Sequence, residues 1–524
     1  MFSRLLKIIV FIIYFSQIFI AAQKKEIVAY YMGRGSENRG YFVKNLKTSG
    51  AAGKITILNY SFAVPGQDPT GKIVLFSNNY VDYEELYSAD KSIDGIADDS
   101  AKPLRGQFNQ LKKLKAQFPG LKILLSIGGW GGCRFYSDAA LTPESREIFV
   151  NDCIDKFIKG NLSLEKNAGG KAIAAGIFDG FDLDWEFPVS GGMEGTHYNV
   201  NDRENFTKLL EVFRRKLDAI NPKLLLTAAV AADVPNVNNY DFKSAEKYLN
   251  WLNLMTYDFH GVWNNAAAHH TNLLSDPADT TEMGMKHSYD KSVKYYIDSI
   301  GISSRKIIPG VAFYGKCWDN VEPANGGLYQ PGTFAAHGFG NYSLLCKLEN
   351  EGYKYYWDTV AMAPYLYNPD KKIFWTFDDP KSVALKSRYA DAYNLGGVMF
   401  WEISGDDSVS TLLNTIYKRN MPDYKYDKNQ NGVTIPLIKI TKPLNNDAFA
   451  AGSNLIIKAV NEENGSPIMK AEFFGDGISL GYATKAPFEW AWFNLPKGRH
   501  RIKAIATDSK GNTAYSKEVE INVR

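Results

Sequence analysis

Three carboxylates occupy alternate positions in the segment 178–188, at Asp182, Asp184 and Glu186. On a β-strand these side chains project to one face, and the apolar residues between them project to the other. Acids about 6–7 Å apart on one face repel each other unless they share protons or bind cations. A proton held in this column keeps Glu186 protonated near neutral pH, which is the state that a general acid needs. The segment therefore predicts acid catalysis with Glu186 as the proton donor.

Two other interpretations of the acidic column are a divalent metal site and a purely structural ladder of acids. A metal site would be expected to draw oxygen ligands from other strands as well, and no obvious set of Asp and Glu appears at the other predicted strand ends. We therefore expect no metal and no cofactor.

The elements that would position these acids are eight short apolar runs that alternate with helix-like segments. In Leu104–Phe118 and Arg203–Ile220, apolar residues recur at spacings of three and four, as on an amphipathic helix. Such alternation predicts a parallel sheet, and eight strands over about 400 residues predict a closed (β/α)₈ TIM barrel, an α/β fold. Glu186 then lies at the C-terminal end of the fourth strand, where barrel enzymes carry their active sites. The eight runs are Ile27–Tyr31, Ile55–Ala63, Leu121–Ile127, Ala175–Trp185, Leu224–Ala232, Trp251–Tyr257, Ile307–Tyr314 and Gly397–Ile403.

Two further parts of the chain depart from the barrel pattern. Residues 316–372, between the seventh and eighth predicted strands, predict an inserted subdomain that walls the cleft; the alternative is a loop without that role. Residues 420–432 are polar and predict a linker. Residues 433–524 form short alternating runs separated by turns, which predict an all-β sandwich of immunoglobulin-like size. The catalytic barrel is thus expected to span residues 23–419.

The N-terminus has the layout of a secretory signal peptide. Arg4 and Lys7 precede an apolar run, and Ala21 and Ala22 follow it. We expect residues 1–22 to be removed and the protein to be secreted, without a membrane anchor after cleavage. The alternative is an uncleaved anchor, because the apolar segment is nearly long enough to span a bilayer.

The chain has four cysteines, an even number that suits two disulfides in an exported protein. Neighbours in sequence favour the pairs Cys133–Cys153 and Cys317–Cys346, and buried free thiols are the alternative. The spacing matches no zinc pattern.

The charges nearly cancel, with 60 Lys and Arg against 57 Asp and Glu and a net charge of +3. Such a balance gives no broad field for nucleic acid or an anionic membrane, so we expect an uncharged partner. We also expect the chain to be a monomer.

The segment Asp179–Glu186, DGFDLDWE, resembles the DxxDxDxE signature of the family 18 chitinases. The resemblance covers roughly residues 27–420 and recurs in order on nearly every predicted strand, whereas the tail is not part of it. The other matching segments are Ala29–Tyr31, Asn59–Ala63, Ser126–Trp130, Met255–Gly261, Phe313–Lys316 and Gly397–Trp401, together with Tyr356–Asp358 and Ala363–Tyr365 in an α+β insertion.

The resemblance implies a retaining hydrolase in which the acetamido group of the sugar is the nucleophile. Glu186 would protonate the leaving oxygen, and Asp184 would hydrogen-bond the acetamido N–H. Asp182 would hold or exchange the proton of Asp184, and Tyr257 would orient the acetamido oxygen.

The resemblance also implies the sugar-binding residues. Trp401 would form the floor beneath the reacting sugar, because pyranose faces stack on indole rings. The other residues implied in substrate binding are Met255 and Asp258 beside the floor, Tyr30 and Phe62 as walls, and Trp130 and Trp263 on the aglycone side. Two departures, Lys316 where many relatives have Arg and Arg34 where relatives often have Trp, affect subsite number rather than the reaction.

The predicted function is therefore a chitinase that acts on chitin or chitooligosaccharides. The first alternative is an endo-β-N-acetylglucosaminidase acting on glycoprotein glycans, and the second is a chitin-binding lectin without activity. The C-terminal sandwich is expected to be a spacer, the alternative being a polysaccharide-binding module with Trp490, Trp492 and Phe493 as its strip.

Overall fold

The computed structural model describes residues 25–281, 287–419, 436–462, 465–509, 511 and 513–524. The predicted signal peptide and the predicted linker lie outside the described residues. Within the described residues, no helix is both long enough and apolar enough to cross a membrane.

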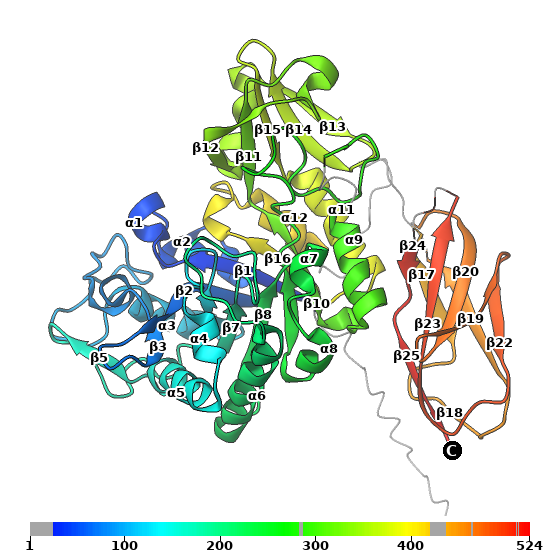
Figure 1. Cartoon of the computed structure of the whole chain (residues 1–524), viewed down its shortest axis with the longest axis horizontal. Helices are drawn as coiled ribbons and strands as arrows, with labels where there is room; N and C mark the ends of the chain where they lie inside the picture. The colour runs from blue at the N-terminus through cyan, green and yellow to red at the C-terminus, as the bar shows by residue number, and fades with distance from the viewer. Residues whose placement is uncertain (1–24, 282–286, 420–435, 463–464, 510, 512) are drawn as a thin grey trace, which may run out of the picture.

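Eight parallel strands form the closed barrel that the sequence predicted (Figure 1). Their order around the barrel is β1-β16-β10-β9-β8-β7-β4-β2, and pairing of β2 with β1 closes the ring. An antiparallel strand, β3 (Ile73–Phe76), pairs with the far end of β2. The barrel strands are β1 (Glu26–Met32), β2 (Ile57–Gln67), β4 (Lys122–Gly128), β7 (Gly180–Asp184), β8 (Leu225–Val230), β9 (Trp251–Leu254), β10 (Ile307–Ala312) and β16 (Gly397–Trp401).

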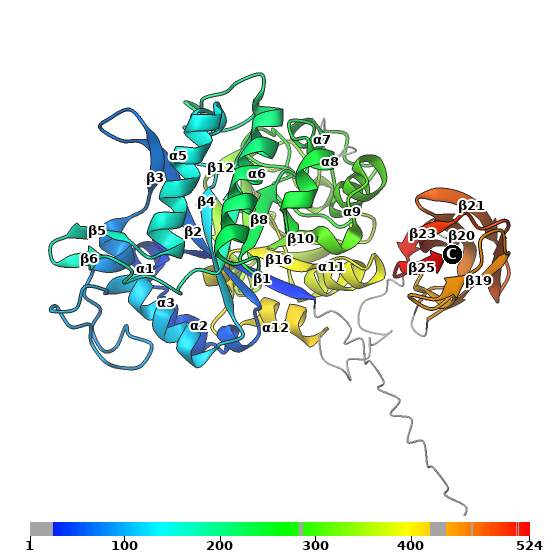
Figure 2. The same ribbon diagram turned by 90° about the horizontal axis from the view of Figure 1, so that it is seen from below.

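Helices surround the strands on the outside of the barrel (Figure 2). In the longest, α6 (Asp202–Ile220), the buried apolar residues Phe206, Leu209, Leu210, Phe213 and Leu217 recur at spacings of one, three and four. This spacing places them on one face, which packs on the strands. The other helices are α1 (Gly35–Arg39), α2 (Val43–Thr48), α3 (Gly106–Gln117), α4 (Tyr136–Ala140), α5 (Pro143–Cys153), α7 (Val234–Val237), α8 (Phe242–Ala245), α9 (Tyr289–Lys294), α11 (Pro380–Ala392) and α12 (Thr411–Lys418).

Between β10 and β16 the chain builds an antiparallel sheet, here called the insertion sheet, which stands beside the barrel at the top of Figure 1. It begins at Tyr314 and ends at Phe377, slightly wider than the predicted 316–372. The short helix α10 (Tyr342–Leu345) follows its second strand. In spatial order its strands are β12 (Thr333–Asn341), β11 (Tyr314–Asp319), β15 (Ile373–Phe377), β14 (Ala363–Asn368) and β13 (Lys354–Asp358).

The C-terminal part is a two-sheet sandwich, as predicted, while the exact domain boundaries remain a prediction. Ile457, Phe473, Ile502 and Ile521 are fully buried in its core. One sheet contains β17 (Ile438–Lys442), β19 (Leu455–Asn461) and β22 (Phe488–Trp492). The other contains β18 (Ala448–Phe449), β20 (Ile468–Gly475), β21 (Ile478–Ala483), β23 (Gly498–Asp508), β24 (Thr513–Tyr515) and β25 (Val519–Val523).

The sandwich docks on the barrel through β24, which lies on the side facing the barrel in Figure 1. Tyr393, just after α11, donates a hydrogen bond to the Thr513 carbonyl at 2.7 Å. The Tyr515 hydroxyl donates to the carboxylate of Asp298 at 2.7 Å, and its ring centroid lies 4.8 Å from that of Tyr393. Ala514 and Tyr515 thereby join the hydrophobic core of the barrel.

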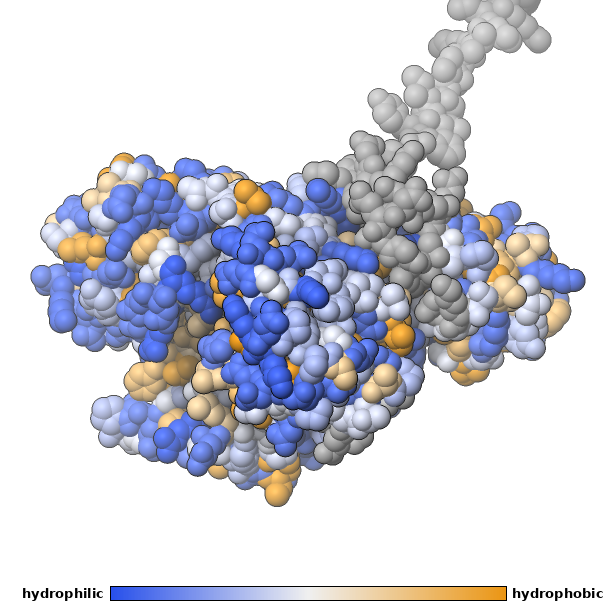
Figure 3. All heavy atoms as spheres, turned by 90° about the horizontal axis from the view of Figure 1, so that it is seen from above, coloured by the Kyte–Doolittle hydropathy of each residue, from blue (hydrophilic) through white to orange (hydrophobic). Residues whose placement is uncertain are grey.

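The visible surface is mostly hydrophilic (Figure 3). On the face shown in Figure 3, hydrophobic residues lie singly or in small groups among hydrophilic ones. Scattered apolar residues of this kind are normal on a folded protein.

Candidate active site

A cavity of about 660 Å³ opens at the C-terminal ends of the barrel strands. Most of the predicted site residues meet there, although they come from six different strands or the loops that follow them. The predicted residues that line the cavity are Tyr30, Phe62, Trp130, Asp184, Glu186, Met255, Tyr257, Asp258 and Trp401.

The predicted alternation of β7 is present. Leu183 and Trp185 are fully buried in the core outside the strands, and the Trp185 ring stacks on Tyr136 at 5.0 Å. Asp182 is buried on the other face and lies below the cavity. The acidic column therefore rises along the barrel interior toward Glu186.

Asp182 is held by four hydrogen-bond donors from four other strands of the barrel, of which only β4 and β8 pair with β7. Its Oδ2 accepts from Tyr30 at 2.7 Å and from Ser126 at 2.9 Å. Its Oδ1 accepts from Thr227 at 2.6 Å and from Asn253 at 3.0 Å. Burial raises the pKa of Asp182, and these hydrogen bonds act in the opposite direction.

Asp184 and Glu186 are the proton-holding members of the column. Burial raises the pKa of Asp184 well above its ordinary value, and the negative charges of Glu186 and Asp182 add to this effect. Burial, with a contribution from Asp258, raises the pKa of Glu186 to about 8. Asp184 Oδ1 is buried and has no hydrogen-bond partner in the described structure. The raised pKa of Glu186 favours its protonated form at neutral pH. Beside it, Asp184 Oδ1 is available to a ligand.

Asp258 is the fixed anion of the cavity. Lys316 Nζ lies 2.8 Å from its carboxylate, Tyr314 donates a hydrogen bond to it, and His270 Nδ1 lies 3.6 Å away. Burial alone would raise the pKa of Asp258, but the Lys316 ammonium and the His270 ring hold that pKa below its usual range. Lys316 and Tyr314 come from β11, so the insertion sheet supplies the groups that keep Asp258 charged.

Aromatic rings form one wall and the floor of the cavity. The Trp401 and Phe62 rings stack with centroids 5.6 Å apart and an interplanar angle of 18°. Tyr30 contacts the same indole at 5.6 Å. Trp130 is 52% exposed, which leaves its face open for a ligand. Flat apolar faces beside polar groups are suited to a pyranose.

Two residues of the resemblance lie elsewhere. Trp263 is not among the cavity-lining residues, and its ring contacts the Lys316 ammonium at 4.8 Å instead. Asp179 lies at the opposite end of β7, where it pairs with Lys115 at 2.8 Å and accepts a hydrogen bond from the Ile123 backbone. Asp179 therefore anchors the strand and does not reach the cavity.

The predicted disulfides are wrong, because all four cysteines are free. Cys133 is buried directly beneath the acids, where its Sγ accepts from the Glu186 backbone N–H at 3.1 Å. The same thiol lies 3.1 Å from the Asp184 carbonyl oxygen, to which it donates. These hydrogen bonds occupy the sulfur of Cys133, which forms no disulfide with Cys153. In the other predicted pair, Cys317 is buried and Cys346 is exposed, and both thiols are free.

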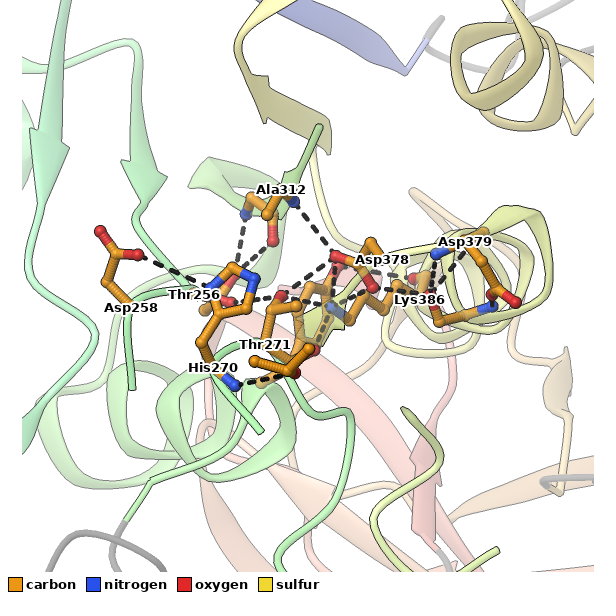
Figure 4. Close-up of polar contacts among 12 residues, drawn as sticks. Thr256, Asp258, His270, Thr271, Ala312, Asp378, Asp379 and Lys386 are labelled. Carbon is orange, nitrogen blue, oxygen red and sulfur yellow. Dashed lines mark hydrogen bonds and ion pairs between the residues drawn. The ribbon is translucent and has the colours of Figure 1, made fainter. Parts of the chain in front are cut away.

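A buried ion pair ties the end of the insertion sheet to the barrel (Figure 4). Lys386 on α11 and Asp378 are both fully buried, with Nζ 2.7 Å from Oδ2. Asp378 also accepts from the Ala312 backbone at 3.1 Å and from Thr271 at 3.0 Å. Figure 4 shows His270, next to Thr271, reaching from this network toward Asp258. Asp378, Lys386, Thr271 and His270 were not predicted as site residues, and Tyr314 was named only as part of the Phe313–Lys316 motif.

Comparison with known proteins gives two family matches. Residues 26–406 match the family model of glycosyl hydrolases family 18, and residues 436–504 match a bacterial Ig domain.

The chain is also similar to individual proteins over most of its length. It is 34% identical to chitinase A1 of Niallia circulans over 81% of this chain, and 34% identical to chitinase C of Streptomyces lividans over 72%. It spans 61% and 57% of the length of those two relatives. Among solved structures, the catalytic domain of psychrophilic chitinase B from Arthrobacter TAD20 is 34% identical, with a TM-score of 0.71 over 76% of this chain and 95% of that one. Chitinase ChiA74 from Bacillus thuringiensis is 25% identical, with a TM-score of 0.65 over 96% of this chain and 85% of that one.

Proposed function

The chain belongs to family 18 of the glycosyl hydrolases, and from this premise we propose that it is a chitinase that hydrolyses β-1,4 linkages of N-acetylglucosamine. The observation that carries the proposal is the position of Glu186 in the lining of an aromatic-floored cavity, where burial raises its pKa to about 8. The names of the similar proteins support chitin or its oligosaccharides as the substrate.

In the first step, Glu186 donates its proton to the glycosidic oxygen while the bond from that oxygen to the anomeric carbon breaks. The acetamido carbonyl oxygen of the same sugar bonds to the anomeric carbon and forms an oxazolinium ion. Asp184 lies beside Glu186, and its Oδ1 has no hydrogen-bond partner among the described residues. Its role is to accept a hydrogen bond from the acetamido N–H and to balance the positive charge of the oxazolinium ion. Tyr257 at the cavity wall orients the acetamido oxygen.

In the second step, the Glu186 carboxylate takes a proton from water as the water oxygen attacks the anomeric carbon. The oxazolinium ring opens as the bond from the acetamido oxygen to the anomeric carbon breaks. This restores the acetamido group, and Glu186 again carries a proton. Two displacements at one carbon retain the anomeric configuration. Asp182 lies beneath Asp184, held by its four donors, and its role is to take up and return the proton of Asp184, so that Asp184 is charged while the oxazolinium ion exists.

Product analysis distinguishes this proposal from its two alternatives. A chitinase releases short oligosaccharides such as chitobiose from chitin, with the β-anomer in excess early in the reaction. Cleavage of a high-mannose glycoprotein without action on chitin would instead identify an endo-β-N-acetylglucosaminidase. Binding of chitin without hydrolysis at any pH would identify a lectin, a reading that the intact acidic column disfavours.

Replacing the donor gives the first prediction. Glu186→Gln should lower kcat on chitooligosaccharides by about 10²–10⁴-fold, because the amide has no proton to donate. Binding to colloidal chitin should change little. The control is Glu165→Gln on the exposed β5 hairpin (Leu162–Glu165), which should keep the wild-type rate. A Glu186→Gln protein with near wild-type turnover would remove Glu186 from the mechanism.

Export is proposed with the same function. Chitin is an insoluble polymer that an enzyme must meet outside its cell, and the predicted signal peptide at residues 1–22 supplies a route. Sequencing the N-terminus of secreted protein tests this, and Gln23 is the expected first residue.

A further inference from the structure

Three potential metal ligands gather on one face of the insertion sheet. Cys317 and Asp319 alternate along β11, so their side chains leave the strand on the same side. The pairing of β11 with β12 is irregular between Lys316 and Trp318, and several residues of β12 lie opposite Cys317 there. One of them is His337, whose Nε2 lies 4.0 Å from Cys317 Sγ. The ligand atoms of the three residues all lie within 4.8 Å of one another.

The three donors form a chemically coherent set. A thiolate, an imidazole and a carboxylate are the ligands that Zn²⁺ uses in proteins, with bonds of about 2.0–2.3 Å. A tetrahedral ion with such bonds separates its ligand atoms by roughly 3.3–3.6 Å. Closing the cluster around an ion therefore needs the ligand atoms to approach one another by up to about 1.5 Å, which the exposed His337 side chain is free to do.

We propose that Cys317, Asp319 and His337 bind Zn²⁺ or a similar divalent transition-metal ion, with water in the remaining coordination position. None of the three lines the active-site cavity, so the ion takes no part in the hydrolysis. Its effect would be to clamp β12 onto β11. Lys316 precedes Cys317 on β11 and projects to the opposite face, where it contacts Asp258. The clamp would therefore stabilise the strand that carries a cavity residue, without touching the cavity.

Proton release gives the site a pH signature. A cysteine binds a metal ion as the thiolate, so the ion displaces the proton of the Cys317 thiol on binding. The affinity for the ion should therefore rise as the pH rises. Carboxylates and imidazole alone would give a weaker dependence above pH 7, because both are already deprotonated there.

Cobalt titration tests the proposal. The full chain, freed of metal with a chelator, is titrated with Co²⁺ alone, and the absorption of cobalt–thiolate coordination is recorded. Wild-type protein should show this absorption, and added Zn²⁺ should abolish it. Cys317→Ser and His337→Ala should each weaken binding at least about tenfold, since each removes a direct ligand.

The control is Cys346→Ser, which removes an exposed cysteine of the same subdomain and should leave the titration unchanged. His337→Ala alters an exposed side chain, so its result does not depend on refolding of a core position. No absorption in wild-type protein, or a Co²⁺ affinity that either ligand substitution leaves unchanged, would overturn the proposal. Chitin hydrolysis, measured in parallel, should be the same in His337→Ala and wild type, which keeps this test separate from that of the proposed function.

Discussion

Glu186 combines the two properties of a proton donor, access to the cavity and a raised pKa. Burial is the larger cause and the charge of Asp258 the smaller. The donor acts only while protonated, so kcat/KM on chitooligosaccharides should decline as the pH rises through about 8. A pH–rate profile measures this limb. A decline centred near the ordinary value for glutamic acid, about 4.3, would contradict the assignment.

Cys133 hydrogen-bonds to the backbone of both Asp184 and Glu186. Cys133→Ala leaves the Glu186 N–H without its partner and should lower kcat about tenfold with little change in KM, because a buried unpaired donor costs about 1–3 kcal/mol. Cys133→Ser keeps a donor and an acceptor and should recover most of the rate. Steady-state kinetics of both variants decide the matter, and equal rates for the alanine and wild-type proteins would refute this positioning role.

The spacing of residues along one strand was enough to predict the acidic column, but not the side chains from other strands that surround it. Asp182 and Glu186 were predicted to share a face because β-strand alternation is local. The four donors to Asp182 come from β1, β4, β8 and β9, and only the closed barrel brings them together. Cys133 was mispaired for the same reason: sequence separation does not reveal that its sulfur is occupied by the backbone of β7.

At the scale of elements, apolar runs predicted all eight barrel strands with small errors at their ends. The fourth began too early, because Gly176 adopts a left-handed φ of 79° and the chain turns before β7 starts at Gly180. The insertion was recognised from its length. Its first strand was placed two residues late, since Tyr314 belongs equally to the apolar run of β10 and to β11.

The Lys386–Asp378 pair fixes the element that follows the insertion sheet. Lys386→Met should lower the free energy of unfolding by about 3–5 kcal/mol, because it leaves Asp378 buried without its counter-charge. Denaturant unfolding measures the loss. Lys208→Met, which removes an exposed pair with Glu204 on α6, is the control and should have little effect. Equal stability of Lys386→Met and wild type would show that the pair is dispensable.

At the scale of the whole molecule, the sandwich is packed on the barrel but supplies no residue to the cavity. Its Trp490 and Trp492, on β22, are partly buried against the opposite sheet of the sandwich, with the Trp492 ring centroid 5.4 Å from that of His500 on β23, which favours the spacer over the binding strip. Deleting residues 433–524 should therefore lower the melting temperature and leave hydrolysis of soluble oligosaccharides and of chitin unchanged. A selective loss on insoluble chitin would instead support a binding module.

Tyr515→Phe loses the hydrogen bonds to Asp298 but keeps the aromatic ring. It should lower the melting temperature by less than the deletion does and leave hydrolysis unchanged.

Docking through β24 also means that the polypeptide is not the sole connection between the two parts. Thr513 and Tyr515 make these contacts about 80 residues after the predicted linker at 420–432. If a protease cut the chain within the predicted linker, the contacts of β24 would keep the two fragments associated. The cleaved protein would then run as two bands on a denaturing gel but elute as one species from a size-exclusion column.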